Sequence, residues 1–172
     1  MKTRKEVKRT VTDTEILGRE LTKKLCEQRG WEFQDGENLD SVYDCFITEN
    51  GLRCMGEIKV RDAKFLRKPT MFLEVKKYRG LVAAARNEST DKIFYINWFG
   101  NVCLIFNITE KLIKDTPIEL SLSNKVTAKS RDVKDKVYKE MYPLPKWKAE
   151  RYILGNYDKI YKEIVEKFNL NL

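Results

Sequence analysis

The stretch Ser41–Arg61, SVYDCFITENGLRCMGEIKVR, predicts a tight β-hairpin that organises the rest of the fold. Asn-Gly at 50–51 is the strongest two-residue hairpin signal, because both central residues of a type I′ turn need a positive φ. This turn makes partner numbers sum to 101, which places Asp44 directly opposite Glu57. The second strand alternates in polarity, so Asp44, Glu57 and Lys59 are predicted to share one face of the sheet.

Two carboxylates at directly opposed strand positions have Cβ atoms roughly 4.5–5.5 Å apart, and such like charges are destabilising unless something neutralises them. Asp44 and Glu57 at that spacing can both reach one Mg²⁺, with Mn²⁺ as a substitute, since these ions prefer oxygen ligands and keep several waters. The backbone carbonyl of Ile58 is a further candidate ligand. Lys59 is expected within reach of a metal-bound water or a bound phosphate.

The rest of the chain reads as an α+β protein with a central mixed sheet flanked by helices. Thr12 and Glu15 match a capping box, which predicts a helix start. Glu20 is expected on the inward side of that helix. Beyond Leu112 the pattern weakens, and residues 113–172 are interpreted as a basic extension of a single domain. The predicted elements are a helix over 12–30, strands over 31–33, 41–48, 52–61 and 71–75, a helix over 77–89, strands over 93–99 and 102–108, and an amphipathic helix capped by Asn156.

Composition narrows the chemistry further. The 172 residues carry a net charge of +8, which favours a polyanionic partner, and nucleic acid is the leading candidate. The absence of histidine excludes Ser-His-Asp triads, His-bearing zinc sites and histidine general bases. Hydrolysis would therefore have to use carboxylates, lysine and a hard metal ion.

The cysteines and the first residues indicate a cytoplasmic protein without a membrane partner. Residues 1–10 form a basic lead-in without an apolar segment, and no later stretch approaches the length of a membrane span. The cysteines include no C-x-x-C pair, so they are expected to be reduced interior residues rather than zinc ligands or a redox site. They are Cys26, Cys45, Cys54 and Cys103.

Asp44, followed after twelve residues by Glu57-Ile58-Lys59 and preceded by the inward Glu20, resembles the PD-(D/E)XK nuclease superfamily over residues 12–108. The resemblance implies a restriction-endonuclease-like core in the order α-β-β-β-α-β-β, followed here by the C-terminal helix. It also implies a Mg²⁺-dependent DNA endonuclease of phage or mobile-element type that leaves a 5′-phosphate. In that family pattern Asp44 and Glu57 are metal ligands, Glu20 assists the metal site, and Lys59 assists the attack of water.

Two departures from the family pattern stand out. Tyr43 occupies the position of the proline before the acidic residue. The helix over 77–89 lacks the Q-x-x-x-Y of RecB-like exonucleases, and Lys77 at its start is expected to serve phosphate binding instead. A second E-x-K triplet, Glu74-Val75-Lys76, is the alternative active pair, although the hairpin register favours the first.

Other interpretations stay open at this level. The charged face could be a solvated strand surface, with Lys59 neutralising one carboxylate. Glu20 could have an ordinary role on the helix surface or in a buried salt bridge. The protein could be a non-catalytic nucleic-acid-binding module of the same fold, or its charged face could recognise a protein. With one catalytic centre per chain, cutting both strands of a duplex would require a homodimer or two binding events.

Basic clusters are expected to contact the phosphates of duplex or branched DNA. One cluster follows the hairpin and consists of Arg61, Lys64, Arg67 and Lys68. Two others are Lys2, Arg4, Lys5, Lys8 and Arg9 at the start, and Lys129, Arg131, Lys134 and Lys136 near the end. Trp147, after Pro143-Leu144-Pro145, is either a core residue or a platform on which a base stacks.

Overall fold

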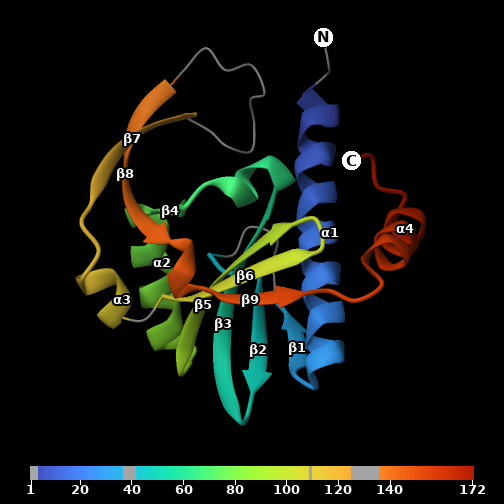
Figure 1. The fold of residues 1–172 in the computed structure, drawn as a ribbon, viewed down its shortest axis with the longest axis horizontal. Coiled ribbons are helices and arrows are strands. Elements are labelled where there is room, and N and C mark those ends of the chain that lie inside the picture. The colour runs from blue at the N-terminus through green and yellow to red at the C-terminus, as the bar shows by residue number, and fades with distance from the viewer. Residues whose placement is uncertain (1–3, 37–41, 109, 125–135) are drawn as a thin grey trace.

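The structure, a computed structural model, describes residues 4–36, 42–108, 110–124 and 136–172 (Figure 1). Helices and strands are both present throughout the chain, as the predicted α+β class requires. In order the elements are α1 (Arg4–Arg29), β1 (Glu32–Asp35), β2 (Cys45–Glu49), β3 (Leu52–Arg61), the 3-10 helix η1 (Ala63–Arg67), β4 (Thr70–Glu74), α2 (Val75–Asn87), β5 (Lys92–Phe99), β6 (Val102–Asn107), α3 (Glu110–Lys114), β7 (Glu119–Asn124), β8 (Lys136–Pro145), the 3-10 helix η2 (Lys146–Lys148), β9 (Glu150–Ile153) and α4 (Tyr157–Phe168).

A six-stranded mixed sheet forms the centre of the fold, in the order β1-β2-β3-β5-β6-β9. Strands β3 and β5 are parallel, and the other neighbours are antiparallel. Helices α1 and α4 lie on one side of this sheet, and α2 lies on the other (Figure 1). The predicted central mixed sheet flanked by helices is therefore confirmed.

The hairpin of β2 and β3 forms at the predicted turn. Asn50 has a φ of 50° and Gly51 a φ of 78°, the left-handed values that a type I′ turn needs. The ladder keeps the predicted register up to the pair Cys45–Gly56. Asp44 lies one residue before β2, and its N–H donates to the carbonyl of Gly56 over 2.8 Å. The expected ladder pair between Asp44 and Glu57 is therefore not formed.

The two faces of β3 pack against different layers. Ile58 joins the core beneath α1, and a Cβ on Gly18 of that helix would lie 2.9 Å from Cγ2 of Ile58. Only glycine allows α1 to approach the strand so closely. Met55 joins the second core, which includes Leu81 of α2. Because side chains alternate along a strand, Glu57 and Lys59 share the α2 side with Met55.

Helix α1 begins earlier than the sequence predicts. It starts at Arg4, so Thr12 lies inside the helix and the capping box does not mark its beginning. Most of the predicted lead-in over 1–10 is consequently helical, because the intervening residues carry no proline or glycine to stop the helix. The predicted end is confirmed: Gly30 has a φ of 70°, and the N–H of Trp31 returns to the carbonyl of Cys26.

The residues beyond 112 contain strands that the sequence analysis missed. β7 and β8 join β4 in a separate three-stranded sheet, and β9 extends the central sheet beside β6. The final helix docks on α1, and its buried Ile160 and Ile164 enter the core beneath it (Figure 1). Asn156 is the N-cap residue by position, but its side chain makes no capping hydrogen bond.

Two further features concern the cysteines and the apolar content of the helices. All four cysteines are buried and carry free thiols, as predicted. Among the helices that the structure describes, none has the length and apolar content needed to span a membrane.

Candidate active site

A buried carboxylate from β3 lies at the centre of the candidate site. The Glu57 side chain is 2% exposed, and lysines from two elements approach its two oxygens. Nζ of Lys59, two residues further along β3, lies 2.7 Å from Oε1. Nζ of Lys77, in the first turn of α2, lies 2.8 Å from Oε2. The first turn of α2 thus places a second ammonium group, that of Lys77, on the face of β3 that carries Glu57 and Lys59.

Burial and charge act on these groups in opposite directions. Burial raises the pKa of Glu57, and the nearby Asp44 raises it further, while Lys59 and Lys77 lower it without cancelling the rise. For Lys59, burial lowers the pKa, but the attraction of Glu57, together with the smaller effects of Tyr95 and Asp44, outweighs burial and leaves the pKa above the usual lysine value. Lys59 therefore remains an ammonium ion at neutral pH.

Asp44 lies beside this group and is fixed from two sides. Its Oδ2 accepts a hydrogen bond from the N–H of Ile58 over 2.7 Å, which ties it to β3 between Glu57 and Lys59. Its Oδ1 accepts from Nη2 of Arg19 over 3.2 Å, and Nη1 of Arg19 donates to the Asp44 carbonyl. Arg19 comes from α1 and is 11% exposed at its side chain, so the charge of Asp44 is held by a buried guanidinium.

The site suits a hard divalent cation with few protein ligands. Oε1 of Glu57 is buried and has no hydrogen-bond partner of regular geometry, although the Lys59 ammonium group lies 2.7 Å away and forms an ion pair with it. Asp44 is near enough to Glu57 to raise the pKa of the Glu57 carboxyl group. Mg²⁺ commonly binds through one or two carboxylates and keeps waters for its other positions. The donor set of Asp44, Glu57 and the Ile58 carbonyl fits that pattern.

Among the contacts that the described residues make with Asp44 and Glu57, none involves Glu20, and its expected role at the metal site stays a prediction. In the described part of the chain, no three side chains of Asp, Glu, Cys or His are gathered in a way that could hold a metal ion. The negative charge of Glu20 acts instead on Lys24, one turn further along α1. The next residue back, Arg19, is the one that reaches Asp44, because α1 packs on the opposite face of the sheet and meets the site only beside the start of β2.

The structure places the other residues that were predicted to contact phosphate in three different settings. Arg61 continues the face of Glu57 and Lys59, and it donates to Asn97 Oδ1 over 3.0 Å and to the Tyr95 hydroxyl over 2.6 Å. Lys77 belongs to the candidate site itself as a partner of Glu57. The remaining members of the cluster, Lys64, Arg67 and Lys68, are exposed in and after η1.

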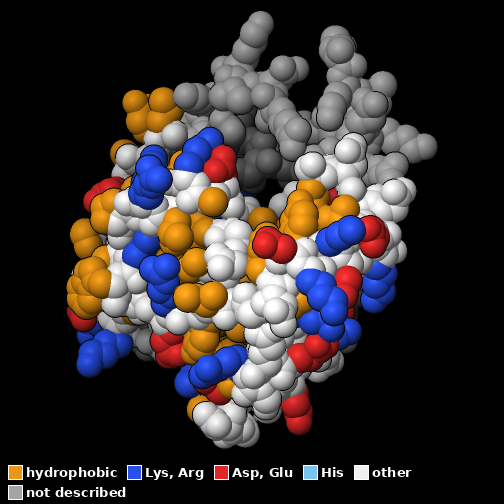
Figure 2. All heavy atoms as spheres, turned by 45° about the vertical axis from the view of Figure 1, so that its right-hand side comes forward, with side chains coloured by type: hydrophobic (Ala, Val, Ile, Leu, Met, Phe, Trp, Pro, Cys, Tyr) orange, Lys and Arg blue, Asp and Glu red, His pale blue; other side chains and the backbone are white. Residues whose placement is uncertain are grey.

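The other two basic clusters lie partly outside the described residues. The residues Lys2, Lys129, Arg131 and Lys134 lie outside the described residues. On the face shown in Figure 2, basic side chains lie among hydrophobic and acidic ones and do not form one continuous band.

The alternative E-x-K triplet lies in a different setting. Glu74 ends β4 in the three-stranded sheet, and its Oε1 lies 2.7 Å from Nζ of Lys139 on β8. Lys76 is exposed on α2. The structure therefore brings Asp44 together with Glu57 and Lys59, while Glu74 pairs with a lysine of its own sheet.

Sequence reasoning missed two contacts of the site, one made by Arg19 and one made by Lys77. The contact of Arg19 with Asp44 joins residues 25 positions apart, and a single sequence contains no signal for it. The contact of Lys77 with Glu57 depends on how α2 packs against β3, so the sequence predicts only that Lys77 lies near the start of the helix. Its expected contact with phosphate stays a prediction.

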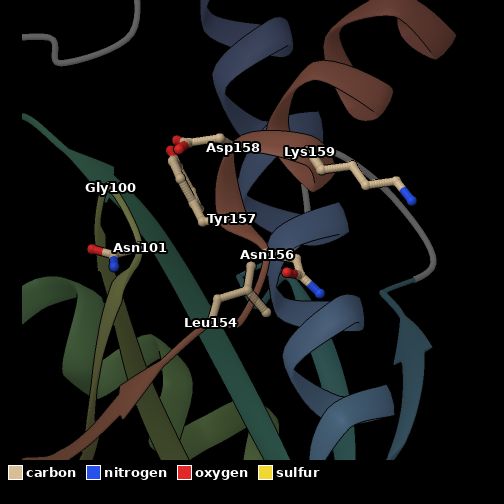
Figure 3. Close-up of a pocket in the computed structure, with 7 residues that line it drawn as sticks. All are labelled: Gly100, Asn101, Leu154, Asn156, Tyr157, Asp158 and Lys159. Carbon is tan, nitrogen blue, oxygen red and sulfur yellow. The ribbon is translucent and has the colours of Figure 1, made fainter.

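One pocket that the structure outlines lies away from this cluster. It has a volume of about 720 Å³ and is formed by the β5–β6 turn and the start of α4. Figure 3 shows Tyr157 and Asp158 at its rim, with the Lys159 side chain directed away from them. Its charged side chains do not converge, so we assign it no chemistry. The lining residues are Gly100, Asn101, Leu154, Asn156, Tyr157, Asp158 and Lys159.

Comparison with known proteins gives a similarity among solved structures. No family model matches the chain, and no curated protein matches it. Among solved structures, the chain is similar to Hjc, a Holliday junction resolvase from the archaeal hyperthermophile Archaeoglobus fulgidus, with 10% sequence identity and a TM-score of 0.44. The match covers 86% of this chain and 96% of that one. At this identity, the chemistry of the site has to be argued from its own residues.

Proposed function

We propose that this chain is a metal-dependent nuclease of the PD-(D/E)XK type that hydrolyses DNA phosphodiester bonds as an endonuclease and leaves a 5′-phosphate. The observation that carries the proposal is the buried Glu57 carboxylate, which lies beside Asp44 and within 2.8 Å of two lysine ammonium groups. A carboxylate costs free energy when it is removed from water, and buried carboxylates with perturbed pKa values cluster at functional sites.

Asp44 and Glu57 would hold Mg²⁺ or Mn²⁺, with the Ile58 carbonyl as a further ligand. When bound, the ion would lower the pKa of a coordinated water and neutralise negative charge on the phosphate. Arg19 and the N–H of Ile58 hold the Asp44 carboxylate in a fixed orientation before any ligand arrives. Such preorganisation reduces the rearrangement needed at the moment of reaction.

Lys59 has the properties of an electrostatic stabiliser rather than a base. Its pKa is raised, so it keeps its proton at neutral pH and cannot accept one from water. Its side chain is 46% exposed, which leaves the ammonium group accessible to a phosphate oxygen. A fixed positive charge at that place favours the more negative transition state over the ground state.

A second candidate function is a nucleic-acid-binding module without catalysis. It is favoured by the two ion pairs of Glu57, which supply positive charge to the carboxylate without a metal ion. In such a module the cluster would be structural, and the basic residues around it would bind phosphate.

A cleavage assay with matched variants separates the two functions. Plasmid, single-stranded and branched DNA are incubated with Mg²⁺, Mn²⁺ or EDTA and with the variants Glu57→Gln and Lys59→Met. The second triplet supplies the control pair, Glu74→Gln and Lys76→Met, which makes the same chemical changes outside the cluster. We expect metal-dependent cleavage that is lost in the first pair and kept in the second.

Three outcomes would contradict the proposal. Cleavage that survives in Glu57→Gln and disappears in Glu74→Gln would move the active pair to β4. If no substrate is cleaved with either metal while DNA binding is intact, the binding module is the better description. Products with a 5′-hydroxyl would contradict the proposed position of bond cleavage. A single centre per chain cuts one strand, so nicked plasmid should precede linear plasmid unless the chain acts as a homodimer.

A further inference from the structure

The two 3-10 helices, η1 and η2, are joined into one surface ridge at the end of β3. Nζ of Lys146 donates to the carbonyl of Phe65 and, over 2.8 Å, to that of Leu66. The N–H of Lys146 donates to the carbonyl of Pro69 over 2.9 Å. Lys146 thus links two segments that lie 80 residues apart in the sequence. Burial lowers the pKa of its ammonium group. We call residues 63–68 and 146–148 the ridge.

The ridge exposes two aromatic rings surrounded by cations. Trp147 is 80% exposed, the highest value among the large hydrophobic residues that the structure describes, and Nζ of Lys148 lies 5.3 Å from its ring centroid. Phe65 is 36% exposed and has Nζ of Lys64 and of Lys68 at 5.3 and 5.1 Å. Burial of a tryptophan ring releases free energy, and a ring that stays exposed to water does not gain it.

The cations of the ridge are mostly without acidic partners. Lys64 pairs with Asp62 over 3.0 Å. Within the described residues, no carboxylate forms an ion pair with Arg67, Lys68 or Lys148. Unpaired cations next to exposed rings match the two parts of a nucleotide, which are a phosphate and a flat base.

The position of the ridge connects it to the candidate site. Lys59 and Arg61 follow Glu57 on the same face of β3, and η1 begins two residues after Arg61. At about 3.3 Å per residue, Arg61 lies roughly 7 Å beyond Lys59 along the strand. Nζ of Lys146 lies 4.9 Å from the ring centroid of Phe99, which is the β5 partner of Arg61. The ridge therefore continues the line of positive charge that starts at Lys59.

We propose that the ridge binds unpaired DNA bases next to the scissile phosphate, with Trp147 stacking on a base and Arg67, Lys68 and Lys148 contacting the adjoining phosphates. This inference rests on the proposed nuclease function and names its substrate class: DNA with a single-stranded segment beside the cleaved bond. In a blunt duplex both faces of each internal base are already stacked on their neighbours, so an exposed indole has no internal base to contact. An unpaired base offers its face at no such cost.

The test measures binding in EDTA, so that it does not depend on cleavage. Fluorescence anisotropy gives the affinity for a labelled single strand, a blunt duplex and a duplex with a single-stranded tail. We compare the unmodified chain with Trp147→Leu, which removes the aromatic ring, and Trp147→Phe, which keeps one. The control is Phe168→Leu on α4, where Lys167 lies 4.8 Å from a ring that is 37% exposed but belongs to a helix packed on α1.

We expect Trp147→Leu to weaken binding of the single strand and of the tailed duplex about tenfold, in the range of base stacking on an aromatic side chain. Binding of the blunt duplex should change less than twofold, Trp147→Phe should retain most of the affinity, and Phe168→Leu should match the unmodified chain. Trp147→Leu should fold normally because so little of the ring is buried.

Three results would overturn the inference. They are unchanged single-strand affinity in Trp147→Leu, an equal loss on blunt duplex, and failure of the unmodified chain to bind single strands at low salt. None of these depends on catalysis, so the nuclease proposal could stand while the ridge fails. Conversely, the proposed function fails if the chain binds tailed DNA through Trp147 but cleaves nothing with Mg²⁺ or Mn²⁺.

Discussion

Replacing Lys77 with methionine tests whether a metal ion can take over the place of a lysine at Glu57. The variant Lys77→Met keeps most of the side-chain volume but removes one of the two ammonium groups beside a carboxylate that is 2% exposed. Exposed ion pairs contribute about 0.2–1 kcal/mol, and breaking a buried pair costs about 3–5 kcal/mol.

The expected cost lies between these limits. Lys77 is 31% exposed at its side chain, and Lys59 still accompanies Glu57 after the change. We therefore expect the free energy of unfolding to fall by roughly 1–3 kcal/mol in EDTA. For a chain of 172 residues this corresponds to a decrease in Tm of roughly 3–10 °C.

Magnesium should reverse the effect. A cation held by Asp44 and Glu57 would replace the positive charge that the substitution removes. In the variant this cation does not have to displace the Lys77 ammonium group or overcome its repulsion. Mg²⁺ should therefore raise the Tm of Lys77→Met by more than it raises the Tm of the unmodified chain. Thermal unfolding is measured with and without Mg²⁺, with the neighbouring exposed Lys76→Met as the control. If Lys77→Met loses the same stability in Mg²⁺ as in EDTA, the ion does not bind at Glu57 and the reasoning is refuted.

Three further predictions concern the same framework. Because burial raises the pKa of Glu57, the folded chain binds its proton more tightly than the unfolded chain, so metal-free stability should fall as pH rises from the ordinary glutamate range through the raised pKa. Urea unfolding across this range should show a shallower fall in Glu57→Gln, and identical slopes would contradict the assignment. Arg19→Met should destabilise the chain by about 3–5 kcal/mol and abolish Mg²⁺-induced stabilisation, because Asp44 loses its buried partner, whereas retained Mg²⁺ stabilisation would show that Asp44 needs no such support. Ile164→Ala should cost about 2–5 kcal/mol in urea unfolding, and a loss below about 0.5 kcal/mol would show that α4 contributes no core packing.

The parts of the fold that the sequence predicts well are those set by local rules. The turn at Asn50 and Gly51 depends on backbone conformations that these two residue types adopt easily, and the register of β2 with β3 follows from it. The same holds for Gly30, where a positive φ ends α1. Alternation along β3 then places Glu57 and Lys59 on one face without any tertiary information.

The parts that the sequence did not predict depend on contacts between distant segments. Helix α1 begins at Arg4 because no helix-breaking residue precedes Thr12 within it. The free energy of the capping pattern at Thr12 is too small to make the helix begin there. The strands β8 and β9 pair with β4 and β6, which lie far away in the chain, and β7 joins the sheet only through β8. The exposed apolar residues of these strands blur the alternation. The partnership of Arg19 with Asp44 and that of Lys77 with Glu57 arise only when both helices have packed on the sheet.

The most direct test of the central claim is a crystal of this chain soaked in Mn²⁺ and examined by anomalous scattering. We predict one strong peak between the carboxylates of Asp44 and Glu57, with the Lys77 ammonium group moved away from Oε2 of Glu57. The account is contradicted if the ion binds elsewhere, or if no peak is present at saturating Mn²⁺ while Lys77 stays in place on Glu57.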